Sequence, residues 1–464
     1  MSFTETLAEF LVRTRFRDLP EETVRHTKAV ILDYLTCVLA GSTASGVPEL
    51  AKVARRHGHS GACTLLILGG RVEPLWAAMV NAAMGHALDF DDTHDQAVLH
   101  TSTIVVPAAL AAAETTGASG EEFLLAVTLA MDLHCRLGLA ATVQPAELGW
   151  IYTPLMGVFA SAAVASKLLK LDTQRTLDSL GLAYSLAAGN HQALNEGTLA
   201  KRLQPAFAAS NGVMAALLSE AGLTGPHQPF EGKFGLFNVY LRGNVNPSKA
   251  LAGLGETFEG DRLSLKPYPS CRHTHSGIDC MVQAYQRGIR AEDVEGVRLQ
   301  VNHAAYAAVC QPEALKYAPR TIVDAQFSLP YTAACALAQG WVYIDDFTTE
   351  GIARPRILKL AEKVKVAIDP EIQQSESRQI TPAKAVLRLR DGHEETILVD
   401  VPKGSPSNPM TDEELGKKLS DCARHCAMRF DDPMMRELVS WVNELEQASA
   451  MNELLDLVSP GVAT

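Results

Sequence analysis

The sequence lacks an excess of positive charge, long hydrophobic runs and the short motifs of several enzyme classes. It has 41 Lys and Arg against 53 Asp and Glu, a net charge of −12. A general nucleic-acid binder needs a basic face, so this balance argues against that class, although a local basic pocket for a small anion is compatible with it. Apolar stretches such as 157–166 end at Lys167, short of the roughly 18 residues that suggest a membrane span. The absence of GxGxxG, GxxxxGK[ST], HExxH and GxSxG motifs leaves nucleotide-binding, zinc-protease and serine-hydrolase functions without support.

The sequence also lacks a disulfide framework and a signal peptide. Its nine cysteines are scattered, odd in number and contain no CxxC pair, which predicts reduced thiols. The N-terminus carries Glu5 early and no apolar core of a secretory signal, so we expect a cytoplasmic protein. A chain of 464 residues exceeds the roughly 250–300 residues at which a single core stops growing, and we therefore expect two domains.

The first 262 residues predict a series of helices. Pro20, Glu21 and Glu22 give a start signal, apolar residues then follow at helical spacing, and Gly41 is a plausible end. Many of the later candidates are rich in Ala and Gly, and small residues allow buried helices to pack closely. These candidates are 76–89, 104–116, 120–138, 155–169, 173–188 and 205–221.

After residue 262 the pattern changes to alternating β-branched residues. Strands are predicted in 294–306 and 363–368, and two more runs, 384–390 and 396–401, flank the turn dipeptide Asp391-Gly392, which favours a hairpin. We therefore predict a mainly α protein with a smaller α+β domain. Its discontinuous all-helical domain, with a helical bundle core, comprises 1–262 and 405–464, and its α+β domain comprises 263–404. Helices are also expected at 323–338, 350–361, 411–426 and 432–446.

The densest polar cluster runs from Asp89 to His100 between two apolar helices. Its acids and histidines are costly in an apolar neighbourhood unless they are paired or used. A metal site and a metal-free acid/base site are both compatible with these residue types, although the spacing is not that of an EF-hand. A capped, solvated loop is the structural alternative.

Three further clusters stand out. Residues 266–275 concentrate positive charge at the predicted domain junction, a common place for small-molecule sites, although a rigid connector would look similar. Lys201 and Arg202 could hold a carboxylate or form a solvated basic turn. The hydroxyl of Tyr331 could act as a general acid, although a core tyrosine is commoner.

Taken in order along the chain, these segments resemble the 2-methylcitrate dehydratase (MmgE/PrpD) family. The family includes 2-methylcitrate dehydratases, cis-aconitate decarboxylases and iminodisuccinate epimerase, and the resemblance runs through nearly the whole chain. It implies a helical domain built from both ends of the chain, an inserted α+β lid, a homodimer, and a site between the domains that uses no metal or organic cofactor. The segments that carry it are 85–94, His100, 105–110, 200–203, 266–271 and 328–331.

Site residues follow from the same resemblance. The implied chemistry is proton transfer next to a carboxylate, with His100 or Asp89 as the base, Tyr331 or His275 as the acid, and nearby cations stabilising negative charge. The predicted catalytic residues are Asp89, Thr93, His100, Lys201, Lys266 and Tyr331, and the predicted substrate-binding residues are Arg202, Arg272, His273, His275 and Tyr152.

One position departs from the family pattern. Decarboxylase-like members place a histidine shortly after a Gly-aromatic pair, whereas this chain has Ile151 after Gly149 and Trp150, and Tyr152 follows. The sequence therefore favours a 2-methylcitrate- or citrate-type dehydratase acting on a small anionic polycarboxylate, with a dicarboxylate epimerase or a cis-aconitate decarboxylase as alternatives. Less favoured hypotheses are a non-catalytic polycarboxylate-binding protein and a metal-dependent enzyme using Asp89, Asp91, Asp92 and His94. No nucleic-acid or membrane partner is expected.

Overall fold

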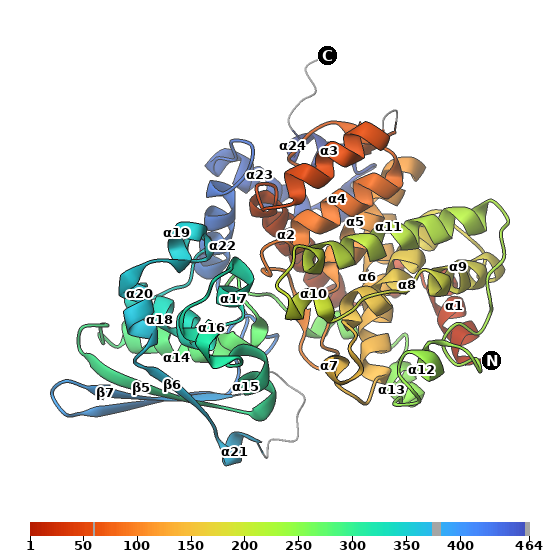
Figure 1. Cartoon of the computed structure of the whole chain (residues 1–464). Coiled ribbons are helices and arrows are strands. Elements are labelled where there is room, and N and C mark those ends of the chain that lie inside the picture. Colours follow the sequence, from red (N-terminus) through yellow and green to blue (C-terminus); the bar gives the residue numbers. More distant parts are fainter. Residues whose placement is uncertain (59–60, 374–381, 460–464) are drawn as a thin grey trace. The chain divides into compact units, whose positions relative to one another are not determined.

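The computed structural model describes residues 1–58, 61–373 and 382–459 (Figure 1). The chain divides into two compact units. Unit 1 comprises residues 1–87, 91–263 and the chain from 422 onward, and unit 2 comprises residues 88–90 and 264–421. The divisions expected from sequence lie at 262/263 and 404/405, whereas those between the units lie at 263/264 and 421/422. Residues 405–421 therefore belong to unit 2 rather than to the helical unit.

Unit 1 is mostly helical, and its predicted helices are present. The helix expected after Pro20 is α2, Glu21–Gly41, and the two other longest helices are α6, Gly120–Ala140, and α11, Ala200–Glu220. The remaining elements of this unit are α1 Phe3–Arg13, α3 Val47–His57, β1 Cys63–Thr64, β2 Arg71–Val72, α4 Pro74–His86, β3 Thr93–His94, α5 Ser102–Thr116, α7 Pro145–Leu148, α8 Tyr152–Leu168, α9 Thr173–Ser185, α10 Gln192–Asn195, α12 Leu236–Val239, α13 Pro247–Leu251, α23 Asp432–Asn443 and α24 Asn452–Leu457, with short 3-10 turns at Phe16–Asp18, Glu259–Arg262 and Leu445–Gln447.

Small residues let the central helices of unit 1 approach closely. Helix α8 packs against α5, α6 and α11. A side chain added at Gly212 of α11 would lie 2.3 Å from the Ser161 Cβ of α8, and one at Gly157 would lie 2.2 Å from Ile104 of α5. Helix α6 is long and apolar enough to cross a membrane, but 94% of its most apolar window is buried within the protein. It is therefore interpreted as a core helix, as the sequence predicts.

Unit 2 contains a four-stranded mixed sheet in the order β6-β5-β7-β8. Strand β5 (Val294–Val301) runs parallel to β6 (Val364–Ile368) and antiparallel to β7 (Ala383–Leu389). The predicted hairpin is confirmed: β7 pairs with β8 (Glu394–Val399), and Gly392 in its turn has a φ of 91°, which suits glycine. Helices α14 (His275–Gln286) and α18 (Leu329–Gln339) pack against the sheet (Figure 1).

Two helices predicted for this unit are each divided in the structure. The 323–338 prediction corresponds to α17, Ile322–Gln326, and α18, Leu329–Gln339. Ser328 separates them because its side chain caps the amide of Tyr331, and Pro330 occupies the first turn of α18. Similarly, 350–361 becomes α19 Thr349–Ile352 and α20 Pro355–Ala361. The other elements are α15 His303–Val309, α16 Glu313–Tyr317, α21 Pro370–Gln373 and 3-10 turns at Arg272–Thr274 and Ile344–Phe347, while β4 Leu263–Ser264 and α22 Asp412–Arg424 cross the division between the units.

Candidate active site

The loop between α4 and α5 is held by a buried carboxylate at the start of α5. Asp92 accepts hydrogen bonds from the amides of Thr101 (3.2 Å) and Ser102 (3.0 Å) and from the Ser102 hydroxyl. The two amides stand at a helix start and have no intrahelical partner. Burial, together with the neighbouring Asp91, raises the pKa of Asp92 to about 7. These hydrogen bonds to the start of α5 therefore explain why Asp92 is buried at this position.

A second carboxylate, Asp91, organises a network of ionisable side chains in unit 1. Its Oδ2 atom lies 2.8 Å from Nδ1 of His86 and 3.5 Å from Nδ1 of His100. Nε2 of His86 lies 3.0 Å from Nζ of Lys201. Helix α4 ends at His86, α11 begins just before Lys201, and the two helices pack together, which is why residues 115 positions apart meet. Asp91, His86 and Lys201 therefore form a continuous line of polar contacts beside His100.

The hydrogen bonds of this network assign the tautomers of both histidines. Nδ1 of His100 lies 2.7 Å from the carbonyl oxygen of Asp92, which can only accept, so Nδ1 donates and Nε2 is the basic nitrogen. Lys201 as an ammonium donates to Nε2 of His86, and Nδ1 of His86 then donates to Asp91. The His86 ring thus donates one hydrogen bond to the Asp91 carboxylate and accepts one from the Lys201 ammonium.

His134 is a further buried residue near His100, and the sequence analysis missed it. It is fully buried, and burial lowers its pKa to about 3, so the ring is neutral. Its Nε2 donates to the Thr153 carbonyl (3.1 Å), its Nδ1 accepts from the Thr101 hydroxyl (3.0 Å), and the Thr153 hydroxyl accepts from the amide of His100 (3.0 Å). The ring therefore fixes the backbone that carries His100. A lone histidine within an apolar helix pattern gives no sequence signal for this role.

The predicted pair Asp89 and Lys266 meets within unit 2. Lys266 is fully buried, and its Nζ donates to the Asp89 carbonyl (2.8 Å) and lies 3.4 Å from Asp89 Oδ1. Asp89 has a φ of 54°, a left-handed conformation that is uncommon outside glycine. The backbone around the pair is fixed by buried Lys418, whose Nζ donates to the carbonyls of Phe90 and Lys266, both at 2.9 Å. The structure thus brings together two of the predicted catalytic residues.

The predicted substrate-binding residues of unit 2 have mainly protein partners. Arg272 is buried and donates to the Lys403 carbonyl (2.7 Å), to the Ser405 hydroxyl and to Nδ1 of His275. His275 is also buried; burial and the cations near it hold its pKa well below the usual range. These contacts make Arg272 and His275 structural in this arrangement. His273 is partly exposed in a 3-10 turn.

The remaining predicted residues are buried against backbone groups. The Tyr331 hydroxyl donates to the carbonyls of Asp346 (2.6 Å) and Gly351 (3.2 Å), and the side chain belongs to the apolar core of unit 2. In unit 1, Tyr152 donates to the Val143 carbonyl (3.0 Å), and Thr93 makes a long contact to the Leu99 carbonyl (3.4 Å). Arg202, also buried, donates to the Ser45 carbonyl (3.2 Å). The geometry therefore favours structural roles for Tyr331 and Tyr152.

The network of unit 1 also meets the spacing of a metal site. One donor atom each from His86, Asp91 and His100 lies within 4.8 Å of the others. However, both Nδ1 atoms already donate to oxygen atoms of the protein, and Lys201 brings a cation to His86. The ligand set proposed from sequence is not assembled either, because Asp92 caps α5 and His94 lies 3.6 Å from Glu259. The donors present fit an acid/base site better than a metal centre.

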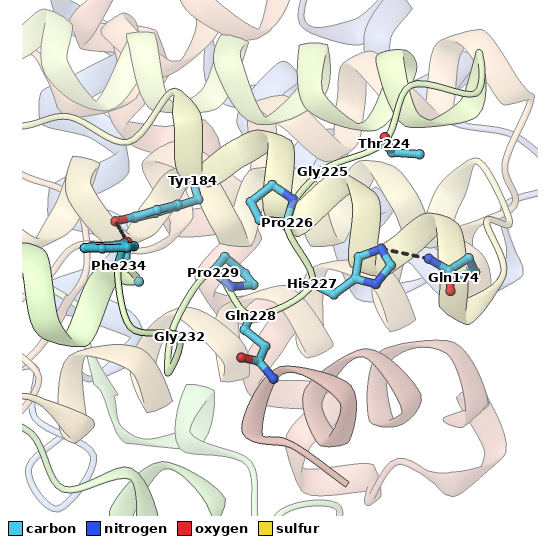
Figure 2. A pocket seen from close by; sticks show the side chains of 11 residues that line it. Gln174, Tyr184, Thr224, Gly225, Pro226, His227, Gln228, Pro229, Gly232 and Phe234 are labelled. Carbon is cyan, nitrogen blue, oxygen red and sulfur yellow. Dashed lines mark hydrogen bonds between the residues drawn. The ribbon is translucent and has the colours of Figure 1, made fainter.

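A separate surface pocket of unit 1 contains none of the predicted site residues. Figure 2 shows Pro226, His227 and Pro229 along one side of it, and Tyr184 with Phe234 at one end. Its two titratable rings have protein partners: His227 is hydrogen-bonded to Gln174 (2.9 Å) and lies 3.0 Å from Asp178, and the Tyr184 hydroxyl donates to the Phe234 carbonyl (2.6 Å). The pocket therefore gives little support for a second reaction centre.

Comparisons with known proteins cover almost the entire chain. Residues 5–248 match the MmgE/PrpD N-terminal domain, and residues 268–440 match the MmgE/PrpD C-terminal domain. A cis-aconitate decarboxylase-like protein of Aspergillus oryzae is 27% identical over 98% of this chain and 97% of its own length. The cis-aconitate decarboxylase of Homo sapiens is 27% identical over 99% of this chain and 95% of its own. A mitochondrial 2-methylcitrate dehydratase of Yarrowia lipolytica is 24% identical over 64% of this chain and 58% of its own.

Proposed function

Because the chain belongs to the MmgE/PrpD family, we propose that it is a lyase for a small tricarboxylate and that it decarboxylates cis-aconitate or a close analogue. The sequence alone favours dehydration. The relatives that match along nearly the whole chain are named decarboxylases, whereas the dehydratase relative matches over 64% of it. Coverage of both domains therefore supports decarboxylation over the dehydratase prediction.

The observation that carries the proposal is the line Asp91–His86–Lys201 beside His100. An ammonium at Lys201 can bind a substrate carboxylate and stabilise negative charge that develops next to it. His100, with Nδ1 bound to the Asp92 carbonyl, exchanges a proton at Nε2. These two groups meet the needs of a reaction that passes through a carbanion beside a carboxylate and ends with protonation of carbon.

The carboxymethyl arm of cis-aconitate loses carbon dioxide, and the electron pair of the broken C–C bond forms a new alkene. The old alkene pair moves onto the carbon next to the remaining carboxylate, giving an enediolate beside the Lys201 ammonium. Protonated His100 then donates its Nε2 proton to that carbon, and the imidazole regains a proton from water. The product is a methylene-substituted dicarboxylate.

Dehydration is the second candidate, and Ile151 favours it. The side chain at this position is apolar, stands at the start of α8 and offers no proton. Dehydration requires neutral His100 to remove an α-proton, whereas decarboxylation requires its protonated form. The two reactions therefore have opposite dependence on the protonation of one residue.

Purified protein should be incubated with cis-aconitate or 2-methylcitrate in deuterated water and followed by proton NMR and carbon dioxide release. We expect carbon dioxide and a deuterated methylene product from cis-aconitate, and no alkene from 2-methylcitrate. His100→Gln should reduce kcat by at least about 10²-fold, the usual contribution of a general acid. Alkene formation from 2-methylcitrate without carbon dioxide would establish dehydration instead, and no reaction with either acid would exclude both candidates.

A further inference from the structure

We propose that His94 is a positioning residue for His100: its backbone and its ring hold the turn that immediately precedes His100, and Glu259 fixes the tautomer of the ring. The inference rests on the function proposed above, in which His100 transfers a proton. The sequence analysis gave His94 a chemical role only as a possible metal ligand, and the structure does not assemble that ligand set.

Residues 94–99 form a turn that is closed by both main-chain and side-chain atoms of His94. The His94 amide donates to the Leu99 carbonyl (2.8 Å), and the His94 carbonyl accepts from the Val98 amide (2.9 Å). Nδ1 of the ring accepts from the Ala97 amide (3.0 Å). One residue therefore makes three hydrogen bonds within the turn, and the next residue after the turn is His100.

The turn contains a strained backbone conformation at Val98. This residue has a φ of 57°, a left-handed conformation that is a genuine outlier for a β-branched side chain. Such a conformation persists only where the surrounding contacts impose it. The hydrogen bonds of His94 reach Val98 itself and the residues on both sides of it, Ala97 and Leu99. They therefore supply a constraint that holds the strained residue in place.

Helix α6 supports the same turn through a glycine. A Cβ added at Gly138 would lie 2.7 Å from Ala97 Cβ and 2.7 Å from Leu99 Cδ2, closer than side chains can approach. The turn thus lies directly against the backbone of α6. His134, on the same helix, fixes the backbone that carries His100 through Thr153. His100 is therefore held by α6 and by the turn that His94 closes.

Glu259 is placed to fix the tautomer of the His94 ring. Because Nδ1 accepts a hydrogen bond, the proton of the neutral ring is on Nε2. Nε2 lies 3.6 Å from Oε2 of Glu259, and both residues are buried. Among the described residues Nε2 has no hydrogen-bond partner, so the Glu259 carboxylate is the anion that favours a proton there. The Glu259 amide donates to Asp132 of α6 (2.7 Å), which fixes the backbone of Glu259.

The proposed role follows from the short connection between the turn and the reacting nitrogen. His100 donates from Nδ1 to the Asp92 carbonyl (2.7 Å) and presents Nε2 for proton transfer. A turn that relaxes at Val98 would move the backbone of His100, and misplacement of a reacting group by about 1 Å can reduce the rate about 10²-fold. His94 acts only through His100 and contacts no reacting atom in this arrangement.

The test compares kcat and KM for cis-aconitate in two variants that each keep one nitrogen position of the ring. His94→Asn places an amide oxygen at the position of Nδ1, where it can accept from Ala97, and has no atom at the position of Nε2. His94→Gln reaches the position of Nε2 and leaves the Ala97 amide without its acceptor. We expect His94→Asn to keep kcat within a few-fold of wild type and His94→Gln to lower it roughly 10–100-fold. KM should change little, because His100 acts on the reacting carbon.

Three further variants separate positioning from support of the fold. His57→Gln, at an exposed histidine that ends α3, is the matched control and should change neither kcat nor Tm. Val98→Gly introduces a residue that adopts the left-handed conformation without strain, so adding it to His94→Gln should restore kcat several-fold. Glu259→Gln should lower kcat a few-fold in the wild type and leave His94→Asn unchanged, since that variant has no atom for Glu259 to act on.

Wild-type kcat in His94→Gln, or an equal loss in both His94 variants without recovery by Val98→Gly, would overturn the positioning role and leave a function shown by wild-type turnover standing. A fall in Tm of His94→Gln with unchanged kcat would assign His94 to the fold instead. Should His94→Gln not fold, its double variant with Val98→Gly is compared with Val98→Gly alone, and equal kcat would overturn the role.

Crystal structures of the variants keep this inference separate from the proposed function. If the wild type turns over neither acid, the proposed function is refuted, and the position of the His100 ring decides the inference. A ring displaced in His94→Gln but not in His94→Asn would support the role of His94, whereas an unmoved ring in both variants would overturn it.

Discussion

The clearest prediction concerns His86, which lies between Asp91 and Lys201. His86→Ala removes both contacts of the imidazole, whereas His86→Asn keeps only one of them. The Asn amide nitrogen takes the place of Nδ1 and can still donate to Asp91, but Asn has no atom at the position of Nε2, which lies 3.0 Å from Lys201. The pair of variants therefore separates support of the fold from positioning of Lys201.

The magnitudes follow from burial. Asp91 is fully buried, so His86→Ala leaves a buried carboxylate without its 2.8 Å partner, at a cost of about 1–3 kcal/mol in the free energy of unfolding, and the lost ring adds a cavity term. His86→Asn should recover most of this stability. Both variants release Lys201 from its position, and misplacement of a binding group by about 1 Å can reduce the rate about 10²-fold.

The assay is urea unfolding alongside kcat/KM for the substrate that is turned over. We expect His86→Asn to unfold close to wild type while kcat/KM falls by roughly 10–100-fold. His393→Asn is the matched control: it also replaces a histidine paired with an aspartate, 3.1 Å from Asp391, but 81% of its side chain is exposed, so little should change. Wild-type kcat/KM in His86→Asn would refute the inference that His86 positions Lys201.

Three other predictions address the remaining buried polar groups. Tyr331→Phe removes the hydroxyl that donates to the buried Asp346 carbonyl at 2.6 Å and should lower the free energy of unfolding by about 1–3 kcal/mol with kcat nearly unchanged; loss of kcat with full stability would instead make Tyr331 catalytic. Lys266→Met leaves buried Asp89 without its cation and should destabilise the protein by about 3–5 kcal/mol, as urea unfolding would report, so any activity lost must be measured on folded protein. The pKa of Asp92 is raised from 3.8 to about 7 in the folded chain. Between these two values the folded state keeps a proton that the unfolded state has released. The free energy of unfolding should therefore fall by about 3 kcal/mol as the pH rises from 5 to 8. Asp92→Asn should remove that slope, and an unchanged slope would show that another group titrates.

Much of the fold was predictable because regular elements leave a periodic signal. The Ala- and Gly-rich helices, the Pro20 start of α2 and the Asp391-Gly392 hairpin are local patterns, and each is present in the structure. The breaks at Ser328 and Arg354 were missed because helical spacing continues across them, while a capping side chain and a following proline interrupt the backbone. The point near residue 421 at which the chain passes from unit 2 back to unit 1 depends on tertiary contacts, which a single sequence does not display.

The same distinction between local patterns and tertiary contacts applies to the candidate site residues. Sequence shows which side chains carry charge, but the partner of each charge is set by chain segments far away. Arg272 and Tyr331 have types and neighbours that suit catalysis, yet their polar atoms are directed to carbonyl groups of the protein. His86 has equally ordinary sequence surroundings, and only its contacts distinguish it, because it connects a buried aspartate to a lysine. The contacts of each charged side chain, more than its residue type, therefore separate candidates for catalysis from residues that hold the fold.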